Sequence, residues 1–225
     1  MGESRASTPP LILPTGLIFL AGLWLLGAWS LTIGLRMPLQ PSSASFEPGL
    51  RLLLQTIVIG FMVGWPLLRL SQAKVARPAG QVWLDLLVLM TLLQVVIWLP
   101  RLFTSWTVAR TIALDLTLLG WMTLVGAMIA SATGTRRTAP RLLVMGACLL
   151  LCLVGPFALA GGRLETFDAL DLVLIGPVGI VRALTESGAT LPSEAQWSAV
   201  TLIGLAAGGA WLGLGLAKVI LTNKK

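Results

Sequence analysis

The sequence contains no histidine and no tyrosine, and only 11% of its 225 residues are charged. Without histidine, the chain lacks the usual acid–base group at neutral pH, so Ser-His-Asp triads, bis-histidine haem sites and zinc-protease sites are excluded. The charged fraction is less than half of the roughly 25% typical of soluble domains. With 56% hydrophobic residues and a mean hydropathy of +0.89, these absences indicate an integral membrane protein.

Cysteine is scarce as well. The two cysteines, Cys148 and Cys152, lie four residues apart in an apolar run and would share one face of a helix. Their Cα atoms would then be poorly placed for a disulfide, and two ligands do not make a zinc site. We expect both side chains to pack as small buried groups, and we predict neither a metal nor a cofactor.

Two partner classes are also disfavoured. The chain has no GxxxxGK[ST] phosphate loop, so any role driven by ATP requires a separate ATPase. The net charge of +7 is spread through short loops and not gathered on one soluble face, so it predicts membrane topology and not nucleic-acid binding.

The sequence contains the long apolar runs that an integral membrane protein needs to cross a bilayer. A transmembrane helix needs about 20 largely apolar residues, and backbone groups inside lipid must be satisfied within the helix itself. The sequence therefore predicts an all-α, polytopic helix bundle that forms one membrane domain over residues 1–225. The six predicted spans cover residues 11–35, 49–70, 81–100, 107–131, 141–160 and 196–221.

The positive charges predict an orientation. One side of the predicted bundle carries ten of the sixteen Lys and Arg residues and a single acid, whereas the other side carries six of each sign. Lys and Arg accumulate in cytoplasmic loops, so both termini are predicted to be cytoplasmic, in a bacterial cytoplasmic (inner) membrane. The ten are Arg5, Arg69, Lys74, Arg77, Arg136, Arg137, Arg141, Lys218, Lys224 and Lys225.

The longest predicted outer connection, residues 161–195, is the most informative segment. Its apolar run 172–181 is too short to cross a bilayer and is broken by Gly176 and Pro177, with Gly179 close behind. The segment at about 164–186 is therefore predicted to be re-entrant or interfacial. Two interpretations stay open: a helix on the outer surface that seals the bundle, or an extracytoplasmic gate. Arg182 and Glu186 are spaced to form an i, i+4 pair.

Two acids lie inside predicted spans, where a charge costs about 2.5–3.5 kcal/mol at the helix centre. Asp85 is one turn from the predicted cytoplasmic end and is expected to extend toward water. Asp115 is expected to be the better buried of the two, and either lines an internal polar seam or pairs with Arg101 or Arg110. A structural ion pair between spans is the alternative. Two further polar candidates inside the spans are Gln55 and Gln94.

Pairs of glycines suggest close helix packing. GxxxG spacing lets two helices approach closely inside a membrane. We predict packing within the molecule, with a homodimer face as the alternative. The pairs are Gly60 with Gly64 in the second span, and Gly204 with Gly208 and Gly209 with Gly213 in the sixth.

The arrangement of six spans, with a break at Gly176-Pro177 before the span 196–221, resembles the membrane subunit of type-2 ABC exporters in topology alone. In that family, two short helices dip into the outer leaflet before the last span, and a separate ATPase binds the cytoplasmic loops. The chain departs from the family pattern in two places. Residues 1–10 cannot form an amphipathic helix, and the loop 71–80 is short for coupling to an ATPase.

The sequence thus predicts a non-catalytic membrane subunit whose surroundings are the lipid bilayer and other proteins. The resemblance implies a permease that needs a separate ATPase. The alternative is a structural or anchoring subunit that associates with other membrane subunits of a larger complex.

Overall fold

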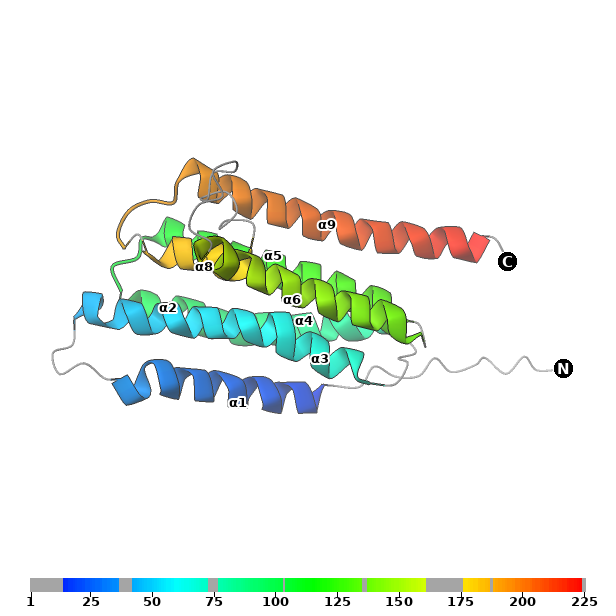
Figure 1. Cartoon of the computed structure of the whole chain (residues 1–225), viewed down its shortest axis with the longest axis horizontal. Helices are drawn as coiled ribbons and strands as arrows, with labels where there is room; N and C mark the ends of the chain where they lie inside the picture. Colours follow the sequence, from blue (N-terminus) through cyan, green and yellow to red (C-terminus); the bar gives the residue numbers. More distant parts are fainter. Residues whose placement is uncertain are drawn as a thin grey trace.

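The computed structural model describes residues 14–36, 42–72, 77–102, 104–134, 137–160, 176–186 and 188–223, and every regular element in these ranges is a helix (Figure 1). The longer helices lie side by side, which confirms the predicted all-α bundle. The helices are α1 (Thr15–Thr32), α2 (Ser43–Ile59), α3 (Trp65–Leu70), α4 (Pro78–Trp98), α5 (Val108–Thr133), α6 (Thr138–Ala160), α8 (Pro177–Glu186) and α9 (Glu194–Asn223), with short turns η1 (Gly34–Arg36), η2 (Gly60–Gly64) and η3 (Pro100–Leu102).

Six of these helical segments are long and apolar enough to cross a membrane, and each overlaps one predicted span. The second segment runs through α2, η2 and α3, and the third runs through α4 and η3. The agreement arises because a run of about 20 apolar residues leaves few alternatives to a spanning helix. The six are Thr15–Thr32, Ser45–Leu70, Pro78–Leu102, Val108–Thr133, Thr138–Phe157 and Glu194–Ile220.

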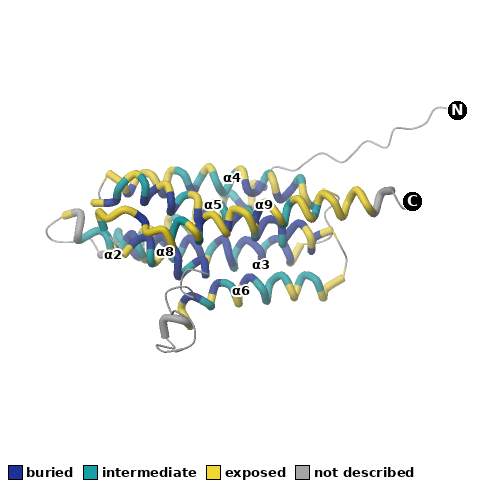
Figure 2. Tube along the Cα trace, turned by 90° about the horizontal axis from the view of Figure 1, so that it is seen from above, coloured by how far each residue is buried: buried dark blue, intermediate teal, exposed yellow. Residues whose placement is uncertain are grey.

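Helix α5 forms the centre of the bundle. It packs against α4, α6, α8 and α9, and 61% of its apolar window is buried, compared with 17% for α9. Figure 2 shows the same contrast, with exposed residues along α9 and α6. Their outward side chains include Leu150, Leu205 and Leu212, which are about 70% exposed and would contact lipid. The core therefore lies around α5, and α1, α6 and α9 form much of the periphery.

The two ends of the bundle carry different features. Helix α1 begins and α9 ends at the same end, which we call the terminal end (Figure 1). At this end Arg141, on the first turn of α6, donates to the backbone carbonyls of Leu70, the last residue of α3, and of Gln72 just beyond it. The opposite end is called the α8 end, because α8 lies there. The start of α1 and the end of α9 thus lie at one end of the bundle (Figure 1), as an even number of spans requires, and their cytoplasmic orientation stays a prediction.

The short helix α8 lies inside the bundle at the α8 end. It packs against α2, α5 and α6, and it buries Ile180, Val181 and Leu184 completely. Its first residues meet α6 near Gly155, about 7 Å before α6 ends at a rise of about 1.5 Å per residue. This short helix therefore packs into the end of the bundle, and both interpretations of the segment, re-entrant and interfacial, stay predictions. Residues 164–175 of the predicted segment lie outside the described residues.

Candidate functional site

Asp85 on α4 is completely buried near the terminal end of the bundle. Arg69 on α3 donates through Nε and Nη2 to its two carboxylate oxygens, and Trp65 Nε1 lies 3.2 Å from Oδ2. Arg69 also donates through Nη1 to the Gln72 side chain, 2.8 Å away. The prediction that Asp85 extends toward water is therefore wrong, because Arg69 reaches it from inside the neighbouring span.

The Arg69–Asp85 pair sits under closely packed helices. A Cβ placed on Gly126 of α5 would lie 3.0 Å from Leu86 and 3.3 Å from Trp65, so only a glycine permits this approach without displacement. The pair is bidentate and its donors are used within the molecule, which is the condition under which a buried ion pair is tolerated. This arrangement keeps both charges paired within the protein and leaves no carboxylate oxygen for a ligand.

Asp115 on α5 has different surroundings. It is only half-buried, so the expectation that it is the better-buried acid is wrong. Its Oδ1 accepts a hydrogen bond from Gln94 Nε2 at 2.7 Å, and Gln94 Oε1 accepts one from Trp98 Nε1 at 3.0 Å. Within the described ranges no Lys or Arg forms a salt bridge with Asp115. The predicted partners Arg101 and Arg110 are therefore wrong.

No family model, curated protein or solved structure matches this chain.

Arg110, one of the two predicted partners of Asp115, is instead completely buried beneath the end of α8. Its Nη1 donates to the Leu184 carbonyl at 2.6 Å, and Nε donates to the Thr190 carbonyl at 2.9 Å. Its Nη2 contacts the Thr190 hydroxyl at 2.9 Å and the Leu191 carbonyl at 3.2 Å. The carbonyls at the end of α8 have no partner within the helix, and a cation beside them interacts favourably with the helix dipole. Arg110 therefore fixes α8 and the following turn.

A second contact holds α8 from the side. The predicted ion pair forms, with Arg182 Nε 2.6 Å from Glu186 Oε1. The same oxygen lies 3.5 Å from Arg51 Nη1 of α2. The contact with Arg51 is missing from the sequence prediction, because residues 135 positions apart give no local signal. A clue existed for Arg69, since it is the cation near the terminal end of the predicted span 49–70 and Asp85 is the acid near the same end of the next span.

The residues of the predicted gate make close backbone contacts. A Cβ on Gly176 would lie 2.8 Å from the Gly155 nitrogen, and a Cβ on Gly155 would lie 2.8 Å from the Gly179 nitrogen. Pro177 begins α8, where its missing N–H is no loss. These residues let α8 meet α6 backbone to backbone, and their role as a gate stays a prediction.

The predicted GxxxG glycines fall into two groups, those that contact a neighbouring helix and those that leave open space. A Cβ on Gly60 would lie 2.5 Å from Trp24 Nε1, so this glycine does accommodate the neighbouring helix α1. In the sixth span the close approach to α5 is made by a different glycine, Gly120, which faces Ile203. The nitrogen of Gly204 lies 3.8 Å from a Cβ placed on Gly120, so Gly204 does lie at the contact with α5. For the remaining glycines, packing within the molecule and the homodimer alternative both stay predictions. A Cβ would meet nothing within 4 Å at Gly64, Gly204, Gly208, Gly209 or Gly213.

Of the remaining candidates, Gln55 is half-buried on α2 and makes no side-chain hydrogen bond to another described residue. Cys148 and Cys152 are buried free thiols on α6, as expected. In the part of the chain that the structure describes, no group of three His, Cys, Asp or Glu side chains is placed to hold a metal ion.

Proposed function

We propose that this chain is a non-catalytic integral membrane subunit that pairs with a partner protein inside the bilayer. The observation that carries the proposal is the half-buried carboxylate of Asp115, which has an amide donor from Gln94 and no cation among the described residues. A charged group inside a membrane is costly unless it is paired, so an unpaired one favours a partner outside the chain.

The position of Asp115 supports a partner helix. Asp115 lies seven residues into α5, about 10 Å from its start at a rise of about 1.5 Å per residue. Its lipid-facing neighbours on α4 and α5 include Val95, Ile112 and Leu116, which are 65%, 38% and 45% exposed. These three residues with Gln94 and Asp115 are called the Asp115 face. Charge complementarity selects a partner span with an Arg or Lys at the same depth.

The absence of catalytic equipment supports a subunit role. The sequence has no histidine and no phosphate-binding loop, and the cations and acids at α8 and α3 are engaged in internal bonds. The connections at the terminal end are short, since α3 ends at Leu70 before α4 begins at Pro78, and α5 ends at Thr133 before α6 begins at Thr138. An activity that requires a nucleotide would therefore belong to another protein.

The proposal can be tested in native membranes with Asp115→Asn. We expect the wild-type chain to migrate in a complex larger than the monomer, and the variant to migrate as a monomer. Thr91→Val is the matched control, because it removes an exposed polar group one turn from Gln94 and leaves the carboxylate intact. A monomeric wild type, or an unchanged complex with Asp115→Asn, would contradict the proposal.

A model helix tests the chemistry of the Asp115 face directly. A polyleucine transmembrane peptide with one Arg about 10 Å from its end is reconstituted with the labelled protein in phosphatidylcholine vesicles. We expect energy transfer to report association about 3- to 18-fold tighter than for the all-leucine peptide, as for polar contacts of about 0.6–1.7 kcal/mol. Equal association of the two peptides, or no loss with Asp115→Asn, would exclude this face.

A permease of the ABC-exporter type is the second candidate, and the observation that favours it is α8. A short helix held between α2, α5 and α6 before the last span fits the topology of that family. The short connections at the terminal end count against docking of an ATPase. The test is reconstitution with a candidate ATPase: a permease should raise its ATP turnover, whereas a structural subunit should leave it unchanged.

A further inference from the structure

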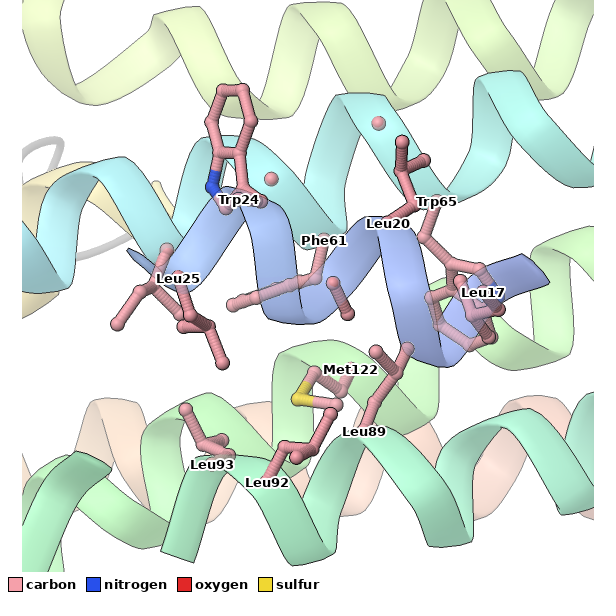
Figure 3. A pocket seen from close by; sticks show the side chains of 14 residues that line it. Leu17, Leu20, Trp24, Leu25, Phe61, Trp65, Leu89, Leu92, Leu93 and Met122 are labelled. Atoms are coloured by element: carbon pink, nitrogen blue, oxygen red, sulfur yellow. The ribbon is translucent and has the colours of Figure 1, made fainter. Parts of the chain in front are cut away.

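A narrow apolar cavity lies between α1 and the body of the bundle. Its volume is about 110 Å³, and it is lined by α1, by the second span around η2, and by α4 and α5 (Figure 3). In this view Leu17 and Leu25 of α1 lie across the space from Leu93 and Met122, with Phe61 between them. We call this cavity the α1 slot. Its described lining consists of apolar side chains, two indoles and glycine backbone.

The slot exists because the second span contains a π-helical turn with a glycine at each end. Gly60 is covered by Trp24, whose ring would collide with any Cβ there, and Trp24 Nε1 donates to the Thr56 carbonyl at 3.2 Å. Gly64 also lines the slot, but a Cβ on it would meet nothing within 4 Å. The space in front of Gly64 is therefore left empty by the protein itself.

The shape of the slot selects its occupant. It follows α1 from Leu17 to Leu25, eight residues or about 12 Å at the helical rise of about 1.5 Å per residue. A volume of about 110 Å³ over this length is narrow, so it suits a linear chain better than a ring system. With no charged group in the lining, nothing in the slot would bind a polar head group.

The slot is continuous with the surface that faces lipid. Leu20 and Trp24 line it and are also 44% and 45% exposed on α1, so the slot opens onto the protein–lipid interface of this span. We propose that the α1 slot binds one acyl chain of a bilayer phospholipid, wedged between α1 and α4. The proposal stands independently of the partner proposed for the Asp115 face.

The test uses the full chain in vesicles that contain a phosphatidylcholine with a diazirine in the middle of one acyl chain. After photolysis, we expect labelling of α1 and α4 that saturates at one lipid per protein and is displaced by excess unlabelled phosphatidylcholine. Labelling of the exposed surface of α9 should be non-saturable and serves as an internal reference. Non-saturable labelling of α1, at the density found on α9, would overturn the proposal.

The second experiment fills the slot with a larger side chain. Gly64→Leu should place its side chain in the empty space and reduce the saturable labelling at least tenfold, with thermal stability equal to or above that of the wild type. Gly146→Leu is the matched control, because Gly146 on α6 also has nothing within 4 Å of its Cβ but lies outside the slot. Undiminished saturable labelling in a folded Gly64→Leu protein would overturn the proposal. If that variant is unstable, Gly64→Ala must lower the labelling at least twofold, or the proposal fails.

Discussion

Asp85 and Asp115 both lie within membrane spans on adjacent helices, yet α4 and α5 place them in opposite electrostatic surroundings. Asp85 is fully buried and held by the guanidinium of Arg69 and the indole of Trp65. Asp115 is half-buried and, among the described residues, accepts one hydrogen bond, from the Gln94 amide. The comparison separates a carboxylate that the fold already satisfies from one that is free to accept a donor from outside.

The largest effect is expected at Asp85. Asp85→Asn would leave the Arg69 guanidinium buried without its counter-charge, and removal of one partner of a buried ion pair costs about 3–5 kcal/mol. The free energy of unfolding in detergent should fall by about this amount. The double variant Arg69→Met with Asp85→Leu should recover most of it, because no lone charge then remains. A single variant as stable as the wild type would break the contrast with Asp115.

A smaller loss is expected at Arg110. Arg110→Gln removes the donors to the buried carbonyls of Leu184 and Thr190, and unsatisfied buried groups cost about 1–3 kcal/mol. Hydrogen exchange of α8 should increase, since its last turn loses its anchor.

The Arg110 variant also sharpens the comparison of the two acids. Combined with Asp115→Asn, its effect on the free energy of unfolding should be additive to within about 0.5 kcal/mol, as for residues without shared partners. A larger coupling energy would mean that Arg110 does serve as the cation for Asp115.

Asp115→Asn itself should change the free energy of unfolding of the isolated chain by less than about 1 kcal/mol, because a hydrogen bond between spans typically contributes about 0.6 kcal/mol. Its consequence should appear in the loss of the native complex. Thermal unfolding of the purified protein measures the first quantity, and native electrophoresis measures the second. A loss comparable to that of Asp85→Asn would place both acids in the same structural class.

The smallest effect is expected at Trp98. Trp98→Phe keeps the ring but removes the donor to Gln94 Oε1, at a cost of about 0.5 kcal/mol. Binding of the arginine-bearing model helix should weaken less than twofold, because Gln94 still contacts Asp115. A loss as large as that of Asp115→Asn would show that the indole, and not the carboxylate, carries the interaction.

The sequence predicts the helices well and their contacts poorly, for a physical reason. An apolar run of 20 residues determines a span locally, and the i, i+4 spacing of Arg182 and Glu186 also predicts their contact. Which cations contact Asp85 and the end of α8 depends on how the helices rotate against one another. Arg110 reaches carbonyls 74 to 81 residues away, and no local period encodes such a distance.

For the same reason, the position of each acid along its span does not predict how far its side chain is buried. Asp85 is one turn from the end of its span, but α3 and α5 close over it. Asp115 is deeper in sequence, but it lies beside a lipid-facing edge where Ile112 and Leu116 are exposed. Depth in the membrane and depth in the protein are separate quantities, and a single sequence reports only the first.

The π-helical turn at Gly60–Gly64 determines the direction of the side chains that follow it in the span. Such a turn accommodates one residue more than an α-helix over the same distance, so regular α-helix through the same five residues would turn every later side chain of the span by about 100°. Arg69 would then face away from Asp85. A single backbone residue in the middle of the span thus sets the direction of the charge at its end.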